Sequence, residues 1–71
     1  MTPKEAKNLI KKLGLTGVGF AELMGKSRSY VSDFNTDGVP ENIAIILTLS
    51  LELKEFGSDP ISIIKNLINH G

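Results

Sequence analysis

Residues 17–34 read GVGFAELMGKSRSYVSDF, and this stretch decides the fold. Its first part is apolar at helical spacing and ends at Gly25, a residue suited to the left-handed backbone of a turn. Ser27 follows and can cap a second helix. The positions that two steeply crossed helices would bury against each other are apolar: Ala21, Met24, Val31 and Phe34. This spacing predicts a helix-turn-helix, whose second helix can lie in the major groove of DNA.

The length and composition indicate one small domain. The chain has 71 residues, of which 41% are hydrophobic, well outside the range of disordered chains. It contains no cysteine, which excludes a disulfide scaffold, thiol catalysis and thiolate zinc sites. The first residues lack a signal-peptide pattern, and the longest apolar-rich run, 43–53, is too short to span a bilayer. We therefore expect a soluble, cytoplasmic protein with no membrane partner.

The charges are unevenly distributed although the net charge is zero. Residues 1–36 contain six basic and three acidic side chains, whereas residues 37–71 contain two basic and five acidic ones. The basic half coincides with the helix-turn-helix stretch. Such an asymmetry can steer one side of a protein toward phosphate groups.

Start and stop signals divide the chain into five helices and predict an all-α fold. Thr2 and Glu5 form a capping box with proline at the first helical position. Glycines at 14, 25 and 57 fall where helices end. We expect a first helix from Pro3 to about Leu13, followed by helices over about 17–24, 27–35 and 40–56 and by a fifth that begins at Pro60. The fifth is capped by Ser58 or Asp59.

Several stretches resemble the phage-repressor and Cro-type helix-turn-helix family, also called the XRE type. LGLT at 13–16 is similar to the link between its first two helices, and FAE at 20–22 with Gly25 matches its scanning helix and turn. SRSYVSDF at 27–34 resembles its recognition helix, and the helices that begin at Pro40 and Pro60 match its last two. The resemblance implies a five-helix, lambda-repressor-like DNA-binding domain over 1–71, with a scanning helix at about 17–24 and a recognition helix at about 27–35.

The resemblance also implies which residues contact double-stranded DNA. Base contacts fall on Arg28, Ser29 and Asp33, because a groove-inserted helix presents the residues near its N-terminus. Arg28 can bond guanine through two hydrogen bonds, and Asp33 can accept one from a cytosine amino group. Contacts to the DNA backbone fall on Lys26, Ser27 and Tyr30, and the tyrosine ring could instead pack against the protein.

The implied function is a sequence-specific DNA-binding transcriptional regulator, a small repressor of phage, prophage or plasmid type. Four departures from the family pattern support an alternative, and one of them is the negative charge that Asp33 places on the outward face. Gly17 stands where a phosphate-holding glutamine is common, Lys26 replaces a small apolar residue, and the loop from Asp37 to Glu41 is acidic. The alternative is a protein-interaction module, antirepressor-like or antitoxin-like, on the same scaffold with weak or no DNA binding.

The fourth helix carries more apolar surface than one small core requires. We expect its inward stripe to contain Ile43, Ile46, Leu49 and Leu53. The remaining apolar side chains predict a dimer or partner surface on the fourth and fifth helices: Leu47, Leu51, Ile64 and Ile68. A homodimer would set two recognition helices about 34 Å apart and require a palindromic operator.

No pattern in the chain indicates catalysis. The single histidine is His70, and no second candidate metal ligand or triad partner accompanies it. The sequence GKS at 25–27 lacks the spacing and the preceding strand of a phosphate-binding loop. We therefore expect no enzymatic activity, no metal, no cofactor and no small-molecule substrate.

Overall fold

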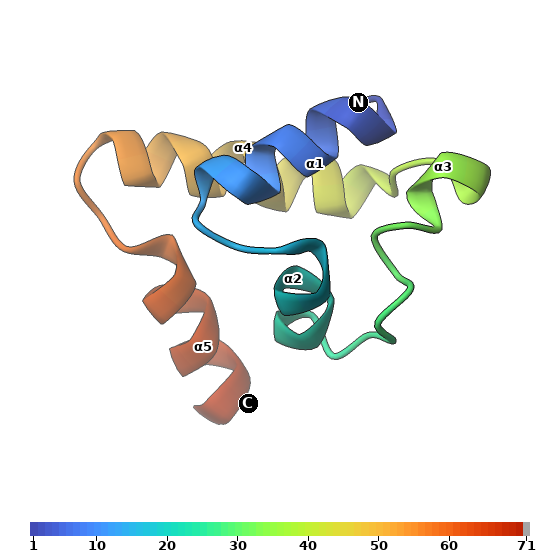
Figure 1. Ribbon diagram of the computed structural model, residues 1–71. Coiled ribbons are helices and arrows are strands. Elements are labelled where there is room, and N and C mark those ends of the chain that lie inside the picture. The colour runs from blue at the N-terminus through green and yellow to red at the C-terminus, as the bar shows by residue number, and fades with distance from the viewer. Residues whose placement is uncertain (71) are drawn as a thin grey trace.

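The described part of the chain is all-α in the computed structural model, which describes residues 1–70 and side chains through Ile68. Within these residues there are five helices and no strand (Figure 1). The helices are α1 (Pro3–Lys12), α2 (Gly17–Leu23), α3 (Phe34–Asp37), α4 (Glu41–Glu55) and α5 (Pro60–His70). The all-α prediction is confirmed, and α1, α2, α4 and α5 begin within one residue of the expected positions.

The predicted caps form. The Thr2 hydroxyl accepts a hydrogen bond from the Glu5 backbone N–H at 3.1 Å, and the Glu5 carboxylate accepts one from the Thr2 N–H at 3.0 Å. The bond from the Thr2 N–H to the Glu5 carboxylate holds the pKa of Glu5 below its usual value. Asp59 accepts from the Ser62 hydroxyl at 2.7 Å and from the Ser62 N–H at 3.3 Å, which lowers the pKa of Asp59. The backbone N–H groups of Glu5 and Ser62, which have no partner within their helices, thereby gain one.

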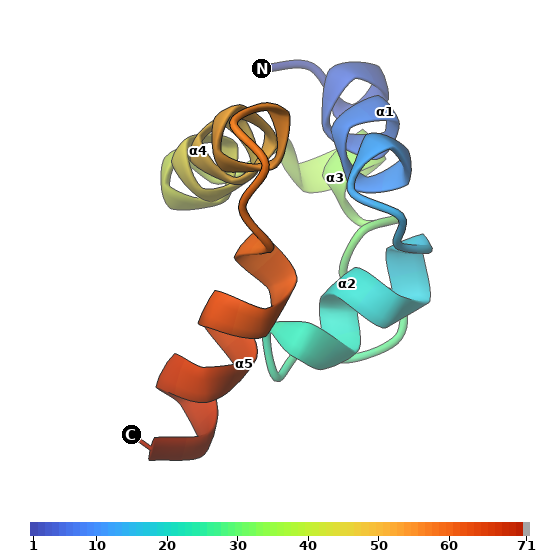
Figure 2. The same cartoon turned by 90° about the vertical axis from the view of Figure 1, so that its left-hand side faces the viewer.

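The core lies between α1 and α4, which run side by side, with α2 packed beneath α1 (Figure 2). The largest fully buried side chains are Phe20, Ile10 and Leu47. Lys54 reinforces the contact between the two long helices, because its ammonium donates to the backbone carbonyl of Lys12 at the C-terminus of α1. The apolar residues predicted to meet across the turn are confirmed as buried at Ala21, Val31 and Phe34; the remaining one, Met24, is partly buried.

The structure differs from the expected third helix over 27–35. Residues 28–33 form consecutive turns, and a regular helix begins only at Phe34 and lasts four residues. The turns are closed mostly by bonds between residues three apart, as from Tyr30 N–H to Ser27 C=O at 3.0 Å. The serines explain the difference, because their hydroxyls bond nearby groups instead of leaving the backbone to form a regular helix: Ser32 donates to the Ser29 carbonyl at 2.8 Å.

The inward face of α4 also differs from the expected stripe. The face toward the core carries Ile43, Leu47 and Ser50, whereas Leu49 is 59% exposed and Leu53 is 41% exposed. Leu47 was expected on a partner surface and is instead fully buried. Because α4 is apolar around most of its circumference, periodicity could not select its buried side; packing against α1 does.

Candidate functional site

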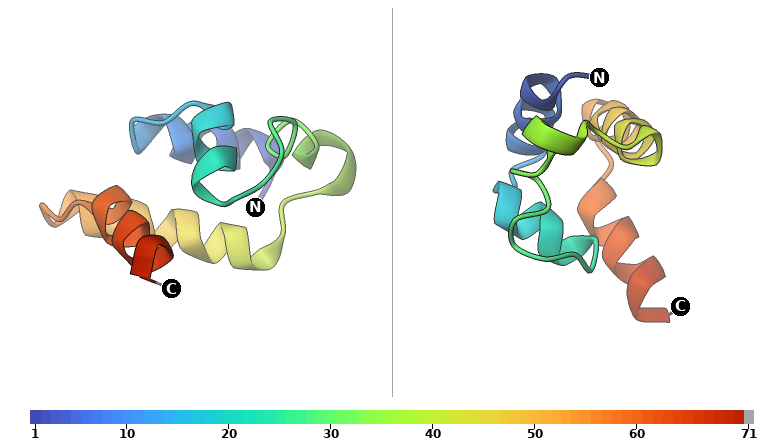
Figure 3. Two further views of the ribbon diagram at one scale, coloured as in Figure 1. Left: turned by 90° about the horizontal axis from the view of Figure 1, so that it is seen from below. Right: turned by 90° about the vertical axis from the view of Figure 1, so that its right-hand side faces the viewer.

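Two features of the fold carry the candidate site. The first is the polar segment, defined as residues 26–33, which leaves α2 at Gly25 and returns to α3 along the outside of the molecule (Figure 3). Gly25 has a φ of +70°, the left-handed conformation expected at the turn. Within the polar segment only Tyr30 and Val31 are withdrawn from solvent, so its remaining side chains are exposed.

Two of the three predicted base-contacting residues bond each other. The Ser29 hydroxyl donates to the Asp33 carboxylate at 3.3 Å, and the hydroxyls of Ser27 and Ser29 lie 3.3 Å apart. The Ser29 hydroxyl thus occupies one acceptor position of the Asp33 carboxylate, and the Ser27 hydroxyl bonds only Ser29. Arg28, the third of these residues, lies exposed beside α2.

The predicted backbone-contacting residues divide into two kinds. Tyr30 is half-buried and packs edge-on against Phe34, with ring centroids 5.2 Å apart. The ammonium of Lys26 lies 5.8 Å from the centroid of the Tyr30 ring, at the distance of a cation–π contact. The structure thus brings Lys26 and Tyr30 together as a packed pair, while Ser27 remains exposed.

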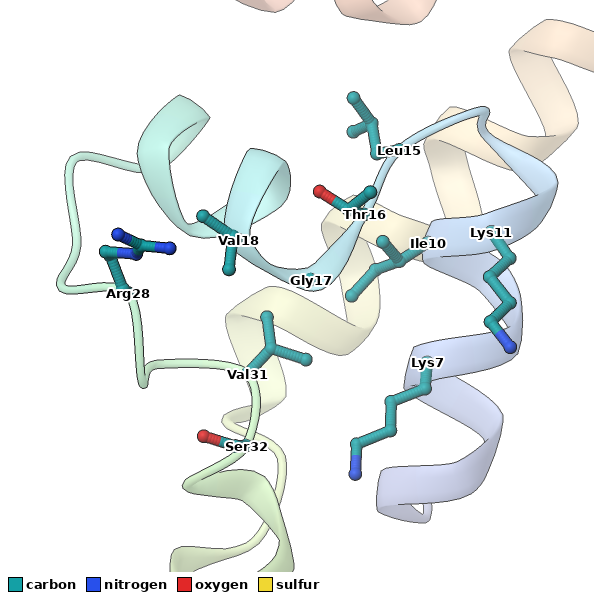
Figure 4. Close-up of a pocket in the computed structure, with 10 residues that line it drawn as sticks. All are labelled: Lys7, Ile10, Lys11, Leu15, Thr16, Gly17, Val18, Arg28, Val31 and Ser32. Atoms are coloured by element: carbon teal, nitrogen blue, oxygen red, sulfur yellow. The ribbon is translucent and has the colours of Figure 1, made fainter.

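The second feature is a hollow of about 540 Å³ between α1, the start of α2 and the polar segment (Figure 4). Its floor is apolar and its rim carries three cations. We call it the basic hollow, and its lining comprises Lys7, Ile10, Lys11, Leu15, Thr16, Gly17, Val18, Arg28, Val31 and Ser32. Lys7 also donates a hydrogen bond to the side-chain oxygen of Asn35 at 3.2 Å.

The helix-turn-helix motif does not predict that Lys7 and Lys11 line a site. Their spacing of four residues puts both on one face of α1, and the excess of basic residues in the first half of the chain is the only other signal. Nothing local indicates that this face meets Arg28, because α1 and the polar segment are brought together by the tertiary fold.

A separate set of apolar side chains lies exposed on α4 and α5. We call it the apolar rows, and it comprises Ile45, Leu49, Leu53, Phe56, Ile63, Leu67 and Ile68, which are 41–85% exposed. Of the four residues predicted for a partner surface, only Ile68 belongs to this set. Leu47 is buried, and Leu51 and Ile64 are half-buried. The exposed face of α4 is therefore the one opposite Leu47.

Comparisons with protein-family models, with curated protein sequences and with solved structures give no match. Among the residues that the structure describes, no group of three or more histidine or carboxylate side chains could hold a metal ion. The side chain of His70 lies outside the described residues. In the same part of the chain, no helix combines the length and the apolar character needed to cross a membrane.

Proposed function

We propose that this chain is a cytoplasmic, sequence-specific DNA-binding regulator of lambda-repressor-like type, in which the polar segment takes the place of the recognition helix. It would be a small repressor of phage, prophage or plasmid type. The observation that supports it best is the exposed polar segment after the turn at Gly25, with Arg28 and the lysines of α1 on the same side of the fold. Repression would work by occlusion of a promoter, because a protein bound there competes with polymerase for the same DNA.

In this proposal Arg28 reads a guanine, and the other groups of the polar segment adjust around it. Ser29 and Asp33 exchange their mutual hydrogen bond for bonds to base edges when DNA is present. Lys26, Ser27, Lys7 and Lys11 supply contacts to phosphate. The turns of the segment leave its hydroxyls free to rearrange, because they are exposed.

Binding of fluorescently labelled duplexes tests this proposal. A site is first selected from random duplexes, and affinities are then measured by fluorescence anisotropy. Arg28→Gln should weaken binding to the selected site by about tenfold and relax the preference at one base pair, because a bidentate contact to guanine contributes about 1–3 kcal/mol. Lys65→Gln, an exposed lysine on α5, is the control and should change nothing. Equal losses for both variants would contradict the role of Arg28.

We further propose that two copies associate through the apolar rows, so that two polar segments meet a palindromic operator. The support is the row of Ile45, Leu49 and Leu53, which are four residues apart on α4 and 41–59% exposed, with Phe56 at 85% after them. Exposed apolar surface of this kind marks sites of protein contact. Sedimentation equilibrium should detect a dimer that Phe56→Ser weakens. A chain that stays monomeric at high concentration would contradict the homodimer.

A second candidate function is a protein-interaction module that uses the apolar rows for a different protein. The observation that favours it is the acidic character of the second half of the chain, since Asp37 and Glu41 lie next to the polar segment and would repel phosphate. This function predicts no selected DNA site at low salt. Recovery of a site that Arg28→Gln weakens would contradict it.

A further inference from the structure

The basic hollow brings an apolar surface and positively charged side chains together in one site. In Figure 4 the apolar side chains of Ile10, Val18 and Val31 lie between Arg28 on one side and Lys7 and Lys11 on the other. Ile10 and Val31 are buried and fixed by the core, whereas Lys11 and Arg28 are exposed. An apolar floor that is mostly buried therefore meets a rim of cationic side chains.

The charge around the hollow is unbalanced. None of its lining residues, all within the described part of the chain, is acidic, so three cationic side chains border one space in a protein of zero net charge. Lys7 uses one of its three N–H donors on Asn35. The remaining donors of Lys7, together with those of Lys11 and Arg28, are available to an anion.

We propose that the basic hollow binds a small amphipathic carboxylate, a molecule with an aryl or medium-chain alkyl body and one anionic end. The apolar body would cover the floor formed by Ile10, Val18 and Val31, and the carboxylate would meet Arg28 or the α1 lysines, since a guanidinium matches a carboxylate through two parallel hydrogen bonds. An inorganic anion leaves the floor uncovered, and a neutral apolar molecule leaves the cations unused. The volume of about 540 Å³ is within the range of small-molecule sites.

Occupancy of the hollow has a consequence that rests on the proposed function. A carboxylate held by Arg28 or by the α1 lysines occupies groups that the proposed function assigns to DNA, so ligand and DNA should weaken each other by the same factor. The hollow would then be an effector site for release of the regulator from DNA. Binding of the carboxylate to the protein alone does not depend on that function.

The test is a titration of isotope-labelled full chain, without DNA, followed by its backbone amide NMR signals. The probe is 4-phenylbutyrate, with acetate as the anion alone and 4-phenylbutan-1-ol as the apolar body alone. We expect 4-phenylbutyrate to shift signals of α1, the start of α2 and residues 28–32 with a Kd on the order of 1 mM, which is typical of a ligand of this size in an open site. The two partial probes should bind at least about tenfold more weakly.

A matched pair of variants tests whether the positive charge at the rim of the hollow contributes to binding. Lys11 lines the hollow, whereas its neighbour Lys12 does not, and both are exposed in the last turn of α1. Lys11→Gln should weaken 4-phenylbutyrate binding about fivefold, near the upper limit for an exposed ion pair. Lys12→Gln should leave binding unchanged. Both substitutions alter the helix charge equally, so the difference reports the hollow.

Three results would overturn the proposal. They are the absence of shifts in the hollow at about ten times the expected Kd, equal binding of the alcohol, and equal effects of the two lysine variants. If the carboxylate binds as expected but no duplex does, the site remains and the DNA-binding function fails. If both bind without competing, the effector role fails and the site remains.

Discussion

Replacing Leu47 with alanine should destabilise the protein far more than the same change at Leu49, two residues away on α4. Leu47 is fully buried against the core, whereas Leu49 is 59% exposed. A buried leucine truncated to alanine costs about 3–4 kcal/mol, because transfer energy is lost and a cavity remains. An exposed one costs about 0.5 kcal/mol or less. For a domain of this size the first change should lower Tm by about 12–32 °C.

Urea denaturation followed by far-UV circular dichroism measures both free energies of unfolding. A low protein concentration is needed, so that self-association does not add to the stability. Domains of this length are stable by only about 3–5 kcal/mol, so Leu47→Ala can unfold outright. In that case the comparison uses Leu47→Val and Leu49→Val. Leu47→Val is expected to lower the free energy of unfolding by about 1 kcal/mol. Equal costs at the two positions, or a larger cost at Leu49, would refute the orientation of α4.

Two other properties can be tested on the same protein. Gly25→Ala should cost about 1–2 kcal/mol, because its φ of +70° strains any residue with a Cβ; an unchanged urea midpoint would contradict the turn. Glu5 and Asp59 have pKa values below their ordinary 4.5 and 3.8, so both carboxylates stabilise the fold above those values and lose that effect as the pH falls through the lowered pKa. The urea midpoint should therefore fall between neutral pH and about pH 3, and the fall should be smaller in Asp59→Asn, which keeps a capping side chain without the charge.

Local chemistry made the helix boundaries predictable. Thr2, Thr16 and Asp59 each accept a backbone hydrogen bond at a predicted helix start. Gly14 and Gly57 have positive φ at predicted helix ends. A cap depends on residues three or four apart in the chain, so the sequence contains all the information that it requires.

The orientation of α4 and the conformation of residues 27–35 were less predictable. Ile43, Leu47 and Leu49 are all apolar, so only the position of α1 determines which side of α4 is buried. Within residues 27–35, helical spacing correctly predicted the burial of Val31 and Phe34. It did not predict regular helix, because serine hydroxyls compete with the backbone.

The candidate site was predictable in part. Arg28 was identified from its place after the turn, and it is exposed as expected. The basic hollow was missed because Lys7 and Lys11 lie about twenty residues before Arg28 in the sequence, and only the tertiary fold brings them to one cavity. The prediction that Leu47 lies on a partner surface is wrong, because the sequence does not determine which side of α4 is buried.

The central claim, that the polar segment contacts DNA, is tested most directly by titrating isotope-labelled protein with the selected duplex and following its backbone amide NMR signals. The account predicts shifts concentrated at residues 26–33 and near Lys7 and Lys11, which weaken as salt rises because phosphate contacts release counterions. Shifts confined to α4 and α5, or no shifts at high duplex concentration and low salt, would contradict it.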